Sequence, residues 1–162
     1  MIEGWTDFFE AQVAAAAALT GLVFVALSIN LQRIVDAPAL VGRAAEALML
    51  LVQPVFVGLA ALVSGQSLRT VGVEVAVISV ILVLAIGRIL VTSGWPAARD
   101  RPHREFATRC SLVVGALVPA LIGSLMMISG NDDGFYLLAI STGMCLAAGI
   151  ADAWVLLVEI MR

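Results

Sequence analysis

The sequence has little charge, no lysine and a single histidine. Charged residues make up 13% of its 162 residues and hydrophobic residues 62%, whereas a soluble domain is about a quarter charged and about half apolar. This composition excludes an ordinary soluble domain and indicates a protein whose main solvent is lipid. All nine Lys and Arg positions are arginine, a bias typical of a GC-rich genome, and we therefore expect a bacterial chain.

Motifs for catalysis and cofactor binding are also missing. There is no GxSxG, HExxH or P-loop pattern, and the lone His103 cannot pair with a second histidine on a haem. Cys110 and Cys145 stand in separate apolar stretches without a CxxC spacing, which favours small buried thiols. The net charge of -3 gives no basic face for nucleic acid. We expect no enzymatic activity, no cofactor, no metal and no nucleic-acid partner.

The chain is dominated by five long apolar stretches. Each is long enough for a helix to cross a hydrocarbon layer of about 30 Å, and in lipid the backbone is satisfied within helices. The connections are short, which favours antiparallel packing of neighbours. The sequence thus predicts one all-α domain over residues 1–162, a polytopic transmembrane bundle with spans at Phe8–Leu31, Ala44–Val63, Val71–Val91, Cys110–Ile128 and Phe135–Ile160.

Arginine placement predicts the orientation of this bundle. Every arginine except Arg69 lies in or beside connections that five crossings place on one side. Cytoplasmic loops retain arginine and lysine, so we expect a bacterial cytoplasmic (inner) membrane protein with its N-terminus outside and its C-terminus inside. No basic residue precedes the first stretch, which argues against a cleaved secretory signal. Anionic lipid headgroups are an expected partner of four loop arginines: Arg99, Arg101, Arg104 and Arg109.

Aromatic residues stand at the ends of several stretches. Trp5, Phe8 and Phe9 open the first, Trp95 closes the third, and Phe135-Tyr136 opens the fifth. Aromatic side chains are enriched at membrane–water interfaces. We therefore expect these residues to be interface anchors.

Ionisable residues inside the spans are the strongest candidates for a site, because they are costly in lipid and usually face protein or water. Asp152 lies about 15 Å from the chain end by helical rise, and Arg88 reaches a similar depth, so we predict that they pair. The same level holds further polar groups: Asn30, Arg33, Glu46 and Glu159. One interpretation is a polar vestibule for an ion or proton, in which Asp152 and Glu46 face water. The other is an interhelical salt bridge.

Small residues recur along one side of three stretches. They are Ala14, Ala17, Gly21 and Ser28 in the first, Gly115, Pro119 and Gly123 in the fourth, and Ser141, Cys145, Gly149 and Ala153 in the fifth. Such rows let membrane helices approach closely, within one chain or between subunits. We expect the first or fourth row to make a subunit contact. In the second stretch, Gln53-Pro54 predicts a kink.

Residues 1–35 carry a family resemblance. Trp5, Phe8-Phe9, an alanine run and the segment Leu19–Leu31 look like the opening of a family of small, uncharacterised bacterial polytopic membrane proteins. Some of these are labelled as modulators of FtsH-type membrane proteases. The resemblance implies a modulator of a membrane complex, and it assigns no functional residue.

Two functions are consistent with the sequence. The first is a non-enzymatic integral membrane protein that assembles with itself or with other membrane proteins, as a modulator or accessory subunit. The alternative is a small oligomeric ion channel or transporter that uses the polar cluster. Missing motifs and small-residue rows favour the first.

The orientation can be tested with a reporter fused after Arg162. We expect a reporter that works only in the cytoplasm to be active there, because the arginine-rich connections share a side with the C-terminus. Activity of a periplasmic reporter at the same position would contradict the predicted orientation.

Overall fold

The computed structural model describes residues 2–94 and 103–161, and every regular element in these ranges is helical. The long helices match the predicted stretches, which confirms the all-α fold. In chain order the elements are η1 (Ile2–Trp5), α1 (Thr6–Ile29), α2 (Leu31–Val35), α3 (Pro38–Leu62), α4 (Leu68–Ile89), the π-helical η2 (Leu90–Gly94), α6 (His103–Ile128) and α7 (Gly134–Met161).

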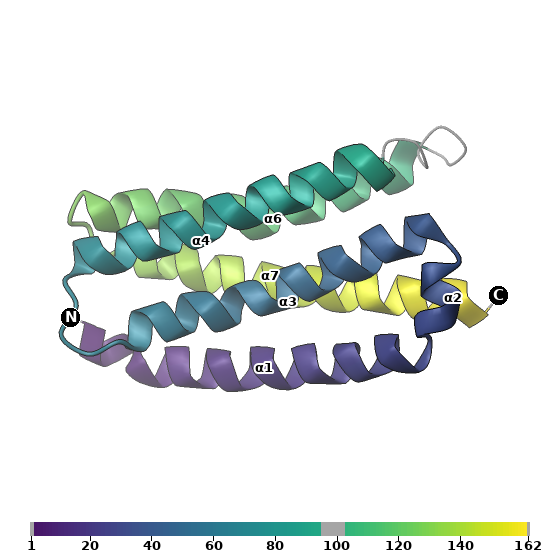
Figure 1. Ribbon diagram of the computed structural model, residues 1–162. Coiled ribbons are helices and arrows are strands. Elements are labelled where there is room, and N and C mark those ends of the chain that lie inside the picture. Colours follow the sequence, from purple (N-terminus) through teal and green to yellow (C-terminus); the bar gives the residue numbers. More distant parts are fainter. Residues whose placement is uncertain (1, 95–102, 162) are drawn as a thin grey trace.

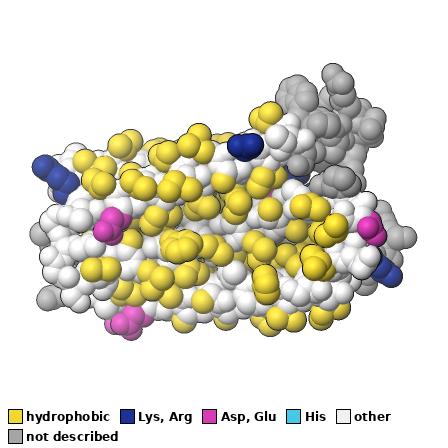
Figure 2. All heavy atoms as spheres, viewed as in Figure 1, with side chains coloured by type: hydrophobic (Ala, Val, Ile, Leu, Met, Phe, Trp, Pro, Cys, Tyr) yellow, Lys and Arg dark blue, Asp and Glu magenta, His cyan; other side chains and the backbone are white. Residues whose placement is uncertain are grey.

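Five of these helices are long and apolar enough to cross a membrane. The apolar segments are Thr6–Ile29, Leu40–Leu62, Leu68–Thr92, Ala107–Ile128 and Gly134–Val158. Large apolar side chains also lie on the outside, and Figure 2 shows them over most of the middle of one face, with most charged side chains toward the two ends. A surface this apolar is not stable in water. The protein is therefore a multi-pass integral membrane protein.

Helix α3 lies at the centre of the helix arrangement. It packs against α1, α4 and α7, while α4 packs on α6 and α6 on α7. Helices α3, α4, α6 and α7 thus form a four-helix bundle in which α3 and α6 face each other diagonally, and α1 lies outside against α3. The termini lie at opposite ends (Figure 1). We call the end that holds α2, residues 94 and 103 and the last residues of α7 the C-terminal end, and the other the N-terminal end.

The first predicted span is longer than the helix that it becomes. Helix α1 ends at Ile29, because Asn30 leaves the helical conformation (φ -105°, ψ 15°) and its side-chain amide donates to the Ala26 carbonyl at 3.0 Å. An asparagine that bonds to its own backbone competes with helix propagation. The chain then makes the short helix α2, and α3 begins at Pro38, whose fixed φ suits a first helical position.

The aromatic residues at the N-terminal end are packed together. The Trp5 ring stacks on Phe135 with centroids 5.6 Å apart, and Phe9 meets Phe135 edge-to-face at 5.8 Å. Phe9 and Phe135 are fully or almost fully buried, whereas Tyr136 is exposed. The interface-anchor interpretation is therefore wrong for Phe9 and Phe135, which belong to the core between α1 and α7. Trp95 lies outside the described residues.

Close backbone contacts hold the N-terminal half of the bundle. An added Cβ at Gly72 of α4 would lie 2.9 Å from the Ser124 carbonyl oxygen of α6, and one at Gly123 would lie 2.7 Å from the Gly134 oxygen of α7. Such spacing leaves no room for a side chain at either glycine. The row on the fourth stretch thus packs inside the chain, so the expectation of a subunit contact there is wrong at Gly123. The row on the fifth stretch is buried as well: Ser141, Cys145, Gly149 and Ala153.

We expect Gly123→Ala to lower the free energy of unfolding by about 1–3 kcal/mol, the usual cost of overpacking, because its methyl group would meet the backbone of Gly134. Gly143→Ala on α7 is the matched control, since nothing lies within 4 Å of its Cβ position. Unfolding by denaturing detergent measures both. Equal stability of the two variants would contradict the close approach of α6 and α7.

Candidate functional site

Four charged side chains gather inside the C-terminal half of the bundle. Arg43 and Glu46 come from α3, Arg109 from α6 and Asp152 from α7. Glu46 and Asp152 each lie six residues inside their membrane segments, a depth of about 9 Å at the helical rise. Both are buried, at 0% and 5% exposure. We call these four residues the charge cluster.

Glu46 and Arg109 connect helices that are not packed neighbours. The Nε–H of Arg109 donates to Oε2 of Glu46 at 2.6 Å, and Nη2 donates to the same oxygen. The pair therefore spans the diagonal between α3 and α6. Charge-assisted bonds of this kind are about twice as strong as neutral ones. The second carboxylate oxygen, Oε1, is buried and has no hydrogen-bond partner among the described atoms.

Arg43 and Asp152 make the second pair, between α3 and α7. Nε of Arg43 lies 3.8 Å from Oδ1 of Asp152, which is too long for a hydrogen bond but close enough for a strong Coulomb attraction inside a protein. Asp152 also lies within electrostatic reach of Arg109. The two acids and two arginines thus act as one group with no net charge.

The neutrality of the cluster explains how it is tolerated at this depth. An isolated charge at the centre of a bilayer costs roughly 2.5–3.5 kcal/mol on insertion scales. Here each carboxylate has a guanidinium beside it, and the arginine side chains are 13–14% exposed at the C-terminal end. The arrangement is an interhelical salt-bridge cluster. Glu46 and Asp152 do not face water in this structure, in contrast to the vestibule interpretation.

The prediction that Asp152 pairs with Arg88 is wrong. Arg88 is exposed on α4, which faces α7 only across the diagonal of the bundle, so Asp152 meets Arg43 instead. Asn30 bonds to its own helix, and the Arg33 side chain is exposed on α2. Arg99 and Arg101 lie outside the described residues, as do the side chains of Arg104 and Glu159.

Arg43 and Arg109 are the two cluster members that the sequence prediction missed. Both were assigned to arginine-rich connections, where they serve the orientation argument. A signal was present, because Arg43 and Glu46 are three residues apart and share one face of a helix. Arg109 is also the last arginine before the fourth apolar stretch. Its side chain bonds to Glu46 inside the bundle, in contrast to the expected contact with lipid headgroups.

An apolar layer lies one helical turn deeper than the charge cluster. Leu50 follows Glu46 by four residues, Val113 follows Arg109 by four, and Ala148 precedes Asp152 by four. These three belong to one buried hydrophobic cluster, completed by Ile86, Ala116, Leu117 and Cys145. The layer separates the charge cluster from the polar side chains that follow toward the N-terminal end, such as Gln53 and Ser141.

A second polar level lies beyond this layer. Ser141 donates to the Ala116 carbonyl at 2.5 Å and accepts a long bond of 3.5 Å from the Gln53 amide. Nearby, the Gln12 amide donates to the Pro54 carbonyl at 2.7 Å, and its oxygen accepts from Thr142 at 2.9 Å. Helix α3 continues through Pro54. These bonds connect α1, α3, α6 and α7 without any charge.

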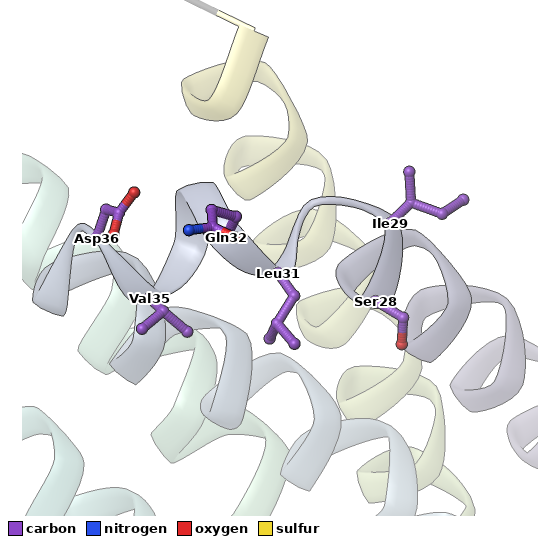
Figure 3. Close-up of a pocket in the computed structure, with 6 residues that line it drawn as sticks. All are labelled: Ser28, Ile29, Leu31, Gln32, Val35 and Asp36. Carbon is purple, nitrogen blue, oxygen red and sulfur yellow. The ribbon is translucent and has the colours of Figure 1, made fainter.

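A surface notch of about 450 Å³ occurs where α1 meets α2. Its lining comes from one continuous segment: Ser28, Ile29, Leu31, Gln32, Val35 and Asp36. Figure 3 shows Leu31 and Val35 pointing to one side and Ile29 and Asp36 to the other. Ser28 donates to its own helix, to the Phe24 carbonyl. The polar groups do not converge, so the notch lacks the geometry of a specific binding site.

In the described ranges no group of three or more His, Cys, Asp and Glu side chains is placed to hold an ion. Comparison with protein-family models, curated proteins and solved structures finds no match to this chain. The assignment of this chain as a multi-pass membrane protein therefore rests on its five long apolar helices.

We expect Glu46→Gln and Arg109→Gln each to lower the free energy of unfolding by about 3–5 kcal/mol, because each leaves a buried charge without its partner. The double variant should lose less than the sum of the two, and Arg88→Gln, at an exposed position, should change little. A double-mutant cycle in denaturing detergent measures the coupling. Additive losses would show that Glu46 and Arg109 do not interact.

Proposed function

We propose that this protein is a non-enzymatic accessory or modulator subunit that assembles through α1 with a second copy or with another membrane protein. The observation that carries the proposal is the uncovered face of α1. This helix packs mainly on α3, and all four residues of its predicted small-residue row are exposed: Ala14, Ala17, Gly21 and Ser28.

The chemistry of this face fits another helix better than it fits lipid. Between residues 11 and 21 the exposed positions of α1 hold only alanine and glycine, and nothing lies within 4 Å of a Cβ at Gly21. By contrast, exposed positions on α4 hold valine, isoleucine and leucine. Small side chains let two helix backbones approach closely and gain packing contacts that lipid tails do not give.

The expected setting is the bacterial cytoplasmic membrane, with the N-terminus outside. The resemblance of residues 1–35 to proteins labelled as modulators of FtsH-type proteases makes such a protease one partner to test. Co-purification in mild detergent would examine it. Dependence of the complex on Gly21 would connect the partner to the α1 face.

A small oligomeric channel or transporter is the second candidate function. Two buried oxygens without hydrogen-bond partners in the described region, Oε1 of Glu46 and Oε1 of Gln53, favour it, because such atoms can accept bonds from water or ions. The apolar layer at Leu50 interrupts a polar route within one protomer. Ion flux in liposomes that disappears in Asp152→Ala would support this alternative.

We expect Gly21→Leu to reduce the mass of the detergent-solubilised protein toward the 16.9 kDa of one chain, because the larger side chain keeps a second helix away from α1. Gly143→Leu is the matched control, since Gly143 is exposed on another helix with nothing near its Cβ position. Light scattering or native mass spectrometry measures the mass. A strictly monomeric wild type, or equal masses for both variants, would contradict self-association through α1.

A further inference from the structure

The two halves of the bundle are held by different forces. At the N-terminal end, α4, α6 and α7 approach so closely that Gly72 and Gly123 have no space for a methyl group. The aromatic cluster around Phe135 adds contacts to α1 there. These are short-range contacts between neutral groups, and they do not depend on charge.

At the C-terminal end, α6 and α7 separate. The two helices are joined by a short turn over residues 129–133, and Figure 1 shows their other ends well apart, with α3 between them in this view. From α3, Glu46 pairs with Arg109 on α6, and Arg43 pairs with Asp152 on α7. The charge cluster therefore connects α3 to both diverging helices at this level.

We propose that the charge cluster is an electrostatic latch: when one of its side chains loses its charge, the C-terminal ends of α3, α6 and α7 separate while the N-terminal half stays closed. The geometry supports a latch because the Glu46–Arg109 pair spans the open diagonal of the bundle. The apolar layer at Leu50 marks the depth at which opening stops, since the helices there are held by buried apolar contacts. The inference concerns helices other than α1 and stands apart from the proposed assembly.

Two native cysteines can be used to detect this motion by chemical labelling. The chain has two cysteines, and Cys110 is partly buried beside Arg109, at the level of the charge cluster. Cys145 is buried in the apolar layer, with its thiol 3.7 Å from the Ala116 carbonyl. Local opening exposes Cys110 only, whereas unfolding of the whole bundle exposes both.

The test measures labelling of both cysteines by N-ethylmaleimide in the full-length protein in liposomes, resolved by mass spectrometry. Asp152→Asn should raise the labelling rate of Cys110 by about tenfold or more, because removal of one partner destabilises a buried pair. Cys145 should keep its wild-type rate.

Arg88→Gln is the control, because it removes an exposed arginine from the C-terminal end of α4 without touching the cluster. It should leave both labelling rates unchanged. Unchanged labelling of Cys110 in Asp152→Asn would overturn the latch. A parallel rise at Cys145 would overturn it as well, because the bundle would then open as one body.

Discussion

Lipid solvates charge poorly, and the positions of the ionised side chains that the structure describes follow from that constraint. Most charges lie toward the two ends, where water is within reach (Figure 2). The two buried carboxylates, Glu46 and Asp152, are each matched by an arginine. Because those arginines come from α3 and α6, satisfying the charges also fixes how α3, α6 and α7 meet. At the C-terminal end, the same side-chain pairs that neutralise the buried charges therefore also set the arrangement of the helices.

The uncharged polar groups satisfy the same constraint in another way. Gln12 and Thr142 use short hydrogen bonds across three helices, and Ser141 bonds to a backbone carbonyl of a neighbour. In an apolar medium such bonds also select one register of the helices, since sliding either helix by a turn leaves buried groups unpaired. The apolar layer between the two polar levels keeps them independent. Loss of the charges and loss of the amide bonds thus disturb different parts of the bundle.

Hydropathy predicted the fold well, because a spanning helix must be both long and apolar. All five spans lie where the composition placed them, and only the ends moved, as at Asn30, where a local side-chain bond stops α1. Depth along the helices was also readable, which is why Glu46 and Asp152 were singled out. The rotation of each helix about its own axis is not readable from the sequence. Arg88 and Arg109 reach comparable depths, yet one is exposed and the other binds Glu46, and only the packing of neighbours decides which.

The same limit explains the aromatic and small-residue rows. Phe9 and Phe135 are residue types typical of a membrane interface, but they pack against each other because the starts of α1 and α7 meet at the N-terminal end. The rows on α1 and α6 have similar composition, and one is exposed while the other lies against α7. A residue pattern tells which helix surfaces can approach closely. It does not tell which neighbour occupies them.

The bonds of Gln12 have a consequence for how the chain is made. Its acceptor at Pro54 is 42 residues farther along the chain and its donor at Thr142 is 130 residues farther. At a synthesis rate of about 5–20 residues per second, Thr142 follows Gln12 by roughly 10 s. During that interval α1 carries an amide that lipid cannot satisfy. The Gln12 amide nitrogen can bond to Pro54 as soon as α3 is made, but its oxygen has no partner from this bundle until α7 is made. The packing of α1 is therefore completed only when α7 joins the bundle.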